Sequence, residues 1–382
     1  MTTFTKVGRS VRDTAQEAVA LALADAGARA EQVQFVAFAN AVGGLITGQE
    51  MVRGQAALRY TGLLGATLVN VEAACASGAA AVELCASAIR AGSADIAVAV
   101  GAERLTAADP STSLAAIGTA LDLEQLDLLR NDDESPRQSA FVYIYAALGL
   151  DYMKRTGATS EDFASVVVKN RQHAGGNPYA QFRSTTTISE VLNSRLVAYP
   201  LTSRMCSTIG DGAAAVVLAS VDAARRLGLA HSALLQSIVV LSGRDDATGP
   251  TVVERASARA FELASIGPSE VDVAEVHDGA APGELISIEQ LGLTDAGGAL
   301  RWLRDGTSAL GGRCPVNPSG GLISRGHPIG ATGVAQIVEL ALQLSGRATG
   351  RQVEGARVAV AENAGGWIGN DSAAGAVTVL TT

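Results

Sequence analysis

One order of helices and strands occurs twice in this chain of 382 residues. In the first copy, apolar residues at helical spacing over 13–26 precede a strand-like run at 33–40. Residues 253–266 and 271–279 repeat the order later in the chain. A repeat of this length indicates a duplicated structural unit. Because each unit alternates helix and strand, the sequence predicts two similar α/β halves.

Each copy continues with a turn of small residues, an apolar helix and two strands. These segments are at 75–92, 95–103 and 210–220 in the first copy, and at 326–346, 357–363 and 370–380 in the second. The strand runs are short and continuously apolar, as expected of strands that helices cover on both faces. The sequence therefore predicts an N-terminal half at 1–225 and a C-terminal half at 226–382.

The two halves differ in two respects. The first half carries an insertion at about 106–203, with helices predicted at 139–155 and 160–173. The second half opens with a predicted strand at 231–243, whereas the first half has only Met1–Ser10 at that place. The first strand of the N-terminal half is therefore expected to be missing or much shortened.

Charge and hydropathy exclude several classes of function. The formal net charge of −9 argues against a general binder of nucleic acid or anionic membranes. No apolar run reaches 18 residues without a charge, and the polar start lacks the apolar region of a signal peptide. We expect a cytoplasmic protein without a membrane span.

Four cysteines are too few for a disulfide framework in a chain of this length, and none lies in a CxxC pair, so no structural zinc is predicted. Cys75 lies between an extended segment and a helix, where the helix N-terminus favours a thiolate. A buried small apolar residue is the alternative for this segment. Cys85 and Cys314 are expected to be structural, and Cys206 to belong to the core.

Two of the four histidines stand in glycine-rich turns of the second half. His277 follows a predicted strand in EVHDGAAP, and His327 lies in NPSGGLISRGHPIGATG. Open α/β sheets bind ligands at such turns, although a lone histidine is more often a satisfied core residue. Neither a P-loop nor a G-x-G-x-x-G motif is present, so no nucleotide cofactor is expected. His173 and His231 receive no role.

Taken together, these motifs resemble the thiolase superfamily, and within it the sterol-carrier-protein-2-type thiolase and lipid-transfer-protein branch. The resemblance rests on ACASG around Cys75, the His277–Asp278 turn, residues 317–333 and residues 361–366. It implies a thiolase fold, in which two similar α/β halves form five layers in the order αβαβα, with a loop insertion in the first half. It also implies a homodimer or dimer of dimers, and a small OB-fold protein as a partner.

The resemblance also implies roles for single residues. Cys75 would accept the acyl group of an acyl-CoA, and His327 would take the thiol proton. His277 would support an oxyanion site, and the backbone N–H groups of Cys75 and Gly365 would form another. These roles fit thioester exchange, which needs a nucleophilic thiol, a nearby base and fixed hydrogen-bond donors. No cofactor or metal is implied beyond the acyl-CoA substrate.

One part of the family pattern is absent. Thiolases that make or cleave 3-ketoacyl-CoA use a second cysteine as acid and base at the α-carbon. Asn363 occupies that position in the C-terminal motif, and Gly279 occupies it in the motif that begins with His277. An amide does not exchange protons near neutral pH. The remaining set of one cysteine and two histidines is similar to that of decarboxylating ketosynthases.

The sequence therefore predicts a thiolase-like acyltransferase that forms a thioester on Cys75. It would pass the acyl group to a carbon or amine nucleophile without the usual second cysteine. One alternative is a conventional acetyl-CoA C-acyltransferase, with His277 as the unrecognised base. The others are an aldolase or lyase, against which Cys75 argues, and a non-catalytic homologue that binds lipid or acyl-CoA.

Overall fold

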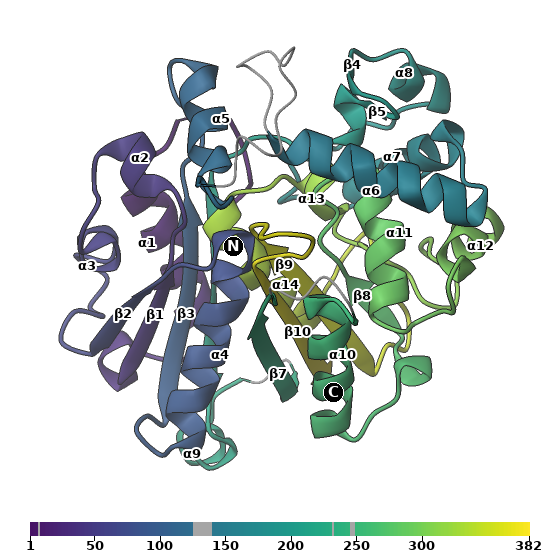
Figure 1. Cartoon of the computed structure of the whole chain (residues 1–382). Helices are drawn as coiled ribbons and strands as arrows, with labels where there is room; N and C mark the ends of the chain where they lie inside the picture. Colours follow the sequence, from purple (N-terminus) through teal and green to yellow (C-terminus); the bar gives the residue numbers. More distant parts are fainter. Residues whose placement is uncertain (7, 125–139, 231–232, 245–248) are drawn as a thin grey trace.

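The computed structural model describes residues 1–6, 8–124, 140–230, 233–244 and 249–382. Two four-stranded sheets lie on either side of a central pair of helices (Figure 1). The strands are β1 (Phe35–Ala39), β2 (Thr67–Val71), β3 (Ile96–Glu103), β6 (Gly212–Ala219), β7 (Leu234–Ser242), β8 (Val273–Glu275), β9 (Val358–Gly365) and β10 (Ala374–Thr381), with a separate short pair, β4 (Leu196–Ala198) and β5 (Leu201–Thr202).

The helices connect these strands and cover their faces. They are α1 (Val11–Ala26), α2 (Gly43–Thr47), α3 (Arg53–Ala57), α4 (Ser77–Arg90), α5 (Pro110–Gly118), α6 (Ala140–Thr156), α7 (Ser160–Gly175), α8 (Ile188–Leu192), α9 (Val221–Leu227), α10 (Val252–Ala264), α11 (Ala281–Gln290), α12 (Gly298–Asp305), α13 (Gly321–Arg325) and α14 (Ile329–Leu344). Among the described residues, no helix is both long and apolar enough to cross a membrane. The expected boundary between 225 and 226 falls within α9 and stays a prediction.

The two sheets share one plan. The first has the order β2-β1-β3-β6, in which β1 pairs parallel to β2 and β3 while β6 is antiparallel to β3. The second has the order β7-β10-β9-β8, with β8 parallel to β9 and β10 antiparallel to both neighbours. All eight residues of β3 are buried, which explains its continuous apolar run. The repeat in the sequence is therefore a repeat in the fold.

Helices and sheets alternate through five layers (Figure 1). Helix α1 covers the outer face of the first sheet, α4 and α14 lie between the two sheets, and α10 covers the outer face of the second. The predicted five-layer thiolase arrangement is thereby confirmed. The central layer matters for the site, because the segments that precede α4 and α14 carry Cys75 and His327.

Glycines allow the central helices to approach backbone to backbone. A Cβ atom on Gly78 of α4 would lie 2.8 Å from the amide nitrogen of Val334 in α14. One on Gly333 of α14 would lie 2.5 Å from the amide nitrogen of Ala79. Neither glycine has a positive φ, so the backbone conformation does not require them. They are glycines because any side chain would push the two helices apart.

The insertion packs mainly against the second half, although it belongs to the first half in sequence. Helices α6 and α7 share one apolar cluster with β8, β9 and α11. Lys169 of α7 pairs with Glu284 of α11 at 3.0 Å, and both side chains are buried. Removing one partner of such a pair leaves an uncompensated buried charge, so the pair fixes α7 on the second half.

Within the described ranges, the first sheet has no full strand that corresponds to β7. Residues 1–5 lie along the start of β6, where Thr5 forms an isolated bridge with Asp211. Thr2 also donates its N–H to the Ala213 carbonyl at 2.8 Å. Among the described residues, the expectation of a missing or much shortened first strand is confirmed. In the second half, the first two residues of the predicted strand at 231–243, His231 included, lie outside the described residues.

Candidate active site

Cys75 lies in a single 3-10 turn, Ala74–Ala76, between β2 and α4. Ala74 has a φ of 47°, which a residue with a side chain adopts only when its surroundings enforce it. Ser77 Oγ accepts from the Ala73 N–H at 2.8 Å, and Glu72 Oε1 accepts from the Ala74 N–H at 2.6 Å. These bonds hold the strained turn, which directs the Cys75 side chain into a cavity between the halves.

His327 precedes α14 and has a defined tautomer. Its Nδ1 lies 2.7 Å from the Thr332 hydroxyl, which itself donates to the Pro328 carbonyl at 3.0 Å. Because the hydroxyl has only one proton, it accepts from Nδ1–H of the histidine. The free Nε2 of His327 is therefore unprotonated and can serve as a base.

His277 follows β8 and has the opposite tautomer. The side-chain amide of Asn363 donates to Nδ1 of His277 at 3.0 Å, so the ring proton is on Nε2. The backbone N–H of His277 donates to Glu362 Oε2 at 2.8 Å. An N–H group that points into the pocket suits a hydrogen bond to a developing oxyanion.

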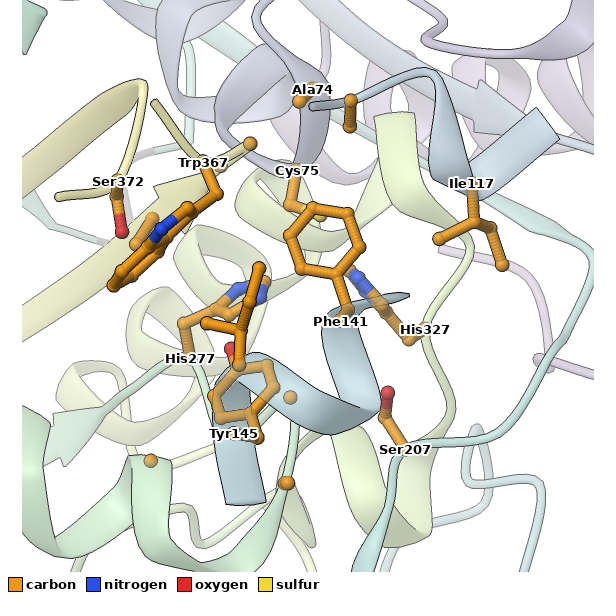
Figure 2. Close-up of a pocket in the computed structure, with 18 of the residues that line it drawn as sticks. Ala74, Cys75, Ile117, Phe141, Tyr145, Ser207, His277, His327, Trp367 and Ser372 are labelled. Carbon is orange, nitrogen blue, oxygen red and sulfur yellow. The ribbon is translucent and has the colours of Figure 1, made fainter. Parts of the chain in front are cut away.

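The structure brings Cys75, His277 and His327 together from three distant parts of the chain (Figure 2). The sulfur and the ring nitrogens lie within 4.8 Å of one another. The two imidazole rings meet edge to face, with centroids 5.1 Å apart and planes at 81°. Among the described residues, they are also the one set of three side chains close enough to hold a metal ion.

Burial keeps all three groups neutral. It raises the pKa of the Cys75 thiol to about 12, against the opposing hydrogen bond from the backbone of Gly366. It lowers the pKa of His277 to about 4, and it lowers the pKa of His327 well below its ordinary value. The direction of the pKa shift at Cys75 is opposite to the lowering expected at a helix N-terminus, because the loss of hydration on burial favours the neutral thiol.

The cavity beside this trio has a volume of about 440 Å³. Its walls are largely apolar, and α5 and α6 of the insertion supply Ile117, Phe141 and Tyr145 (Figure 2). Trp367 of the second half faces them across the cavity. A cavity of this kind accommodates an apolar group and places it beside the Cys75 sulfur.

The other predicted residues lie at or near the trio. A Cβ on Gly365 would lie 2.7 Å from the Cys75 amide nitrogen, so the absence of a side chain there permits the strained turn. The amides that contact the sulfur belong to Gly366, next to the predicted Gly365, and to Cys75 itself. Cys85 and Cys314 are buried. Cys206 differs from the expected core residue, because it is half-buried and lines the cavity.

Several residues of the site carried no signal that singled them out in the sequence. Thr332 lies in the quoted glycine-rich segment, and its hydroxyl five residues after a histidine was the one clue to its role. No sequence motif contains Phe141, Tyr145 or Trp367. Only folding brings these residues to the cavity. His173, which received no role, is buried and accepts from the Leu310 N–H at 3.0 Å.

Comparison with known families assigns both halves of the chain. The model of the thiolase N-terminal domain matches residues 1–194, and the model of the thiolase C-terminal domain-like family matches residues 235–380. The chain belongs to the thiolase family. The predicted family, its sterol-carrier branch and a thiolase-like acyltransferase enzyme are confirmed.

Relatives of this thiolase-family protein are named as a thiolase subunit, an acetyltransferase and a sterol carrier protein. The benzoylsuccinyl-CoA thiolase subunit BbsB of Thauera aromatica is 38% identical over 345 residues, which cover 88% of this chain and 85% of that protein. An acetyl-CoA acetyltransferase of Methanothermobacter thermautotrophicus is 38% identical over 94% of this chain and 92% of its own. Sterol carrier protein 2 of Bos taurus is 34% identical over 96% of this chain and 68% of its own.

Solved structures agree with the fold of this thiolase-family protein. The structure named Ltp2-ChsH2(DUF35) aldolase matches with a TM-score of 0.80 and 26% identity, over 100% of this chain and 95% of that chain. Human mitochondrial 3-ketoacyl-CoA thiolase matches with a TM-score of 0.72 over 100% of this chain and 96% of its own. Its 17% identity supports the fold alone.

Proposed function

We propose that this thiolase-family protein forms a thioester on Cys75 from an acyl-CoA and passes the acyl group to a carbon or amine nucleophile. The proposal rests on one observation: the convergence of the Cys75 sulfur with two imidazoles of opposite tautomers within 4.8 Å. One ring offers a free nitrogen to take a proton, and the other offers an N–H to stabilise negative charge. Both are needed for thioester exchange.

The first half-reaction follows from these tautomers. His327 Nε2 takes the Cys75 proton as the sulfur attacks the thioester carbonyl, since a resting thiolate is disfavoured by burial. The oxyanion that develops receives hydrogen bonds from backbone amides at the Cys75 turn and the adjoining glycines. Collapse of the intermediate releases the CoA thiolate, which recovers the proton from His327. The acyl group then occupies the apolar cavity beneath α5 and α6.

A second cavity supports a CoA thioester as the donor. It has a volume of about 460 Å³, and Cys206 and Thr208 line both cavities. Its wall includes Arg171, which lies 4.2 Å above the Phe182 ring, and Arg204. Two guanidinium groups beside hydroxyl side chains suit the phosphate groups of CoA.

Intact-protein mass spectrometry tests the proposal. The protein is mixed with a panel of acyl-CoAs, and the modified peptide is mapped. We expect an adduct of the acyl mass on Cys75, none in Cys75→Ala, and acylation slowed by about two to four orders of magnitude in His327→Ala. Absence of an adduct with every donor, or unchanged turnover in Cys75→Ala, contradicts the proposal.

The match to the structure named Ltp2-ChsH2(DUF35) aldolase favours a second candidate function, a carbon–carbon lyase. A lyase of that kind does not need the cysteine. Retention of cleavage by Cys75→Ala, with an aldehyde or ketone product, would support the lyase and contradict the acyltransferase.

The two-part name of that structure also motivates the proposal of a small OB-fold partner, which co-purification tests. Assembly as a homodimer or dimer of dimers and a place in the cytoplasm are proposed with it.

A further inference from the structure

Gly279 leaves a space in the site that Tyr145 fills. The φ of Gly279 is not positive, so the backbone conformation does not require glycine. A Cβ atom at this position would overlap the Tyr145 hydroxyl and lie 2.7 Å from Cζ of the same ring. Even alanine at position 279 would collide with the phenol. Glycine is therefore present because the Tyr145 side chain needs the room.

A second glycine completes the slot for this ring. A Cβ on Gly283 in α11 would lie 3.1 Å from Cε1 of Tyr145. One on Gly149 of α6 would lie 3.0 Å from Cγ of Pro282 in α11. Small residues on both helices thus bring α6 close to α11 and fix the phenol between them. The position of the Tyr145 ring is consequently set by its packing against Gly279 and Gly283.

The Tyr145 hydroxyl is free to contact a substrate. It lines the same cavity as Cys75 and His277, and Figure 2 shows the Tyr145 ring beside His277. Among the residues that the structure describes, none forms a hydrogen bond with this hydroxyl. Burial raises the pKa of Tyr145 above its ordinary value. The phenol is therefore protonated and acts as a donor.

We propose that the Tyr145 hydroxyl is the proton donor to the α-carbon in this site, in place of a thiol at position 279. The inference rests on the proposed Cys75 thioester and extends it to substrates of the 3-oxoacyl-CoA class. In relatives of the sterol-carrier type, the resemblance places the acid and base at position 279. Here that side chain is absent, and a hydroxyl from the insertion occupies the same space.

The cleavage step balances without any further reactant. The Cys75 sulfur bonds to the 3-oxo carbon, and its proton passes to His327 Nε2. The C2–C3 bond then breaks, and its electron pair stays on C2 as the enolate of the CoA thioester. The Tyr145 O–H bond breaks as a C–H bond forms at C2. The proton held by His327 finally returns to the phenolate, which leaves an acyl-Cys75 and a shortened acyl-CoA.

Two acyl donors that give the same acyl adduct on Cys75 distinguish protonation of the α-carbon from simple thioester exchange. An acyl-CoA acylates Cys75 without any protonation of carbon, whereas the 3-oxoacyl-CoA that carries the same acyl group requires it. We expect Tyr145→Phe to slow acylation by the acyl-CoA at least tenfold less than acylation by the 3-oxoacyl-CoA, because only the second reaction needs a proton on carbon. With the 3-oxoacyl-CoA, we expect a loss of about two to four orders of magnitude. Rapid-quench mass spectrometry measures both rates.

Tyr152→Phe is the matched control, because it removes a hydroxyl from the same helix. That hydroxyl donates to Glu289 at 2.8 Å and does not line the cavity. We expect Tyr152→Phe to retain both rates within threefold. Equal loss with both donors in Tyr145→Phe, or no loss with either, overturns the role of Tyr145. So does a wild-type protein that acylates from the acyl-CoA but not from the 3-oxoacyl-CoA.

If Tyr145→Phe does not fold, a second pair of variants tests the proposal by moving the acid from position 145 to position 279. Tyr145→Ala empties the space, and Tyr145→Ala with Gly279→Cys places a thiol in it. We expect the double variant to cleave the 3-oxoacyl-CoA at least tenfold faster than Tyr145→Ala alone; no gain overturns the proposal. If neither donor modifies wild-type Cys75, the proposed thioester itself is wrong, and this result is distinct from a failure at Tyr145 alone.

Discussion

At the scale of single residues, the site depends on which nitrogen of each histidine carries the proton. Thr332 decides this for His327 through a bond of 2.7 Å. We expect Thr332→Val to slow Cys75 acylation about 10- to 100-fold, because the ring loses the acceptor that fixes its tautomer and orientation. Thr332→Ser keeps the hydroxyl and should stay close to the wild type. Equal rates for the Val and Ser variants would contradict this role.

His173 gives a prediction of pH dependence. Its Nδ1 lies 3.0 Å from the Asn317 carbonyl, its Nε2 accepts from the Leu310 N–H, and burial lowers its pKa to about 3. Below pH 6.5 the unfolded chain therefore binds a proton at His173 that the folded chain does not bind. As the pH is lowered from 6.5 to 3, the contribution of this residue to the free energy of unfolding therefore falls by about 1.4 kcal/mol per pH unit.

His173→Gln isolates that contribution. The variant is less stable than the wild type at pH 7, since it disturbs two buried hydrogen bonds. As the pH falls from 6.5 to 5, we expect the difference in stability between the two proteins to shrink by the same slope. Urea unfolding at each pH measures it. A difference that stays constant would show that His173 titrates normally in the folded protein.

At the scale of elements, the contact between α4 and α14 fixes the position of Cys75 relative to His327. We expect Gly78→Ala to lower the free energy of unfolding by about 1–3 kcal/mol, because its Cβ meets the Val334 amide at 2.8 Å. Cys75 acylation should slow as well, since these helices adjoin Cys75 and His327. Gly118→Ala in α5 meets no atom within 4 Å and serves as the control, with stability unchanged or raised by up to about 1 kcal/mol. Thermal melts and acylation rates check both variants.

At the scale of the whole molecule, the shared central layer predicts that the halves unfold together. Helices α4 and α14 lie between both sheets, so neither sheet retains its inner cover when the other unfolds. Cys85 and Cys314 are both fully buried, Cys85 in α4 of the first half within the apolar cluster that joins the two sheets, and Cys314 in the second half within a separate cluster. In a Cys75→Ala protein, thiol labelling in urea followed by peptide mapping should give one midpoint for both cysteines. Two separate midpoints would show independent halves.

The sequence predicted most of the framework, because apolar runs and helical spacing report burial directly. It predicted β3 at 95–103 and α4 within 75–92, but not β2, whose exposed edge position leaves Thr67–Val71 mostly uncovered and without an apolar run. Cys75, His277 and His327 were found because each stands in a motif. Tyr145 was not, because its relation to Gly279 spans 134 residues and exists only in the packed structure.

The origin of the cavity walls has a practical consequence for redesign. The thiol and the imidazoles come from the duplicated framework, whereas α5 and α6 come from the insertion and cover the acyl space. Variant libraries confined to the inward-facing positions of α5 and α6 other than Tyr145 would therefore sample new substrates while the covalent chemistry stays intact. Such a library keeps one readout, the mass of the adduct on Cys75, for every member. The duplicated framework thus supplies the nucleophile and the base, and the insertion supplies the walls that select the acyl group.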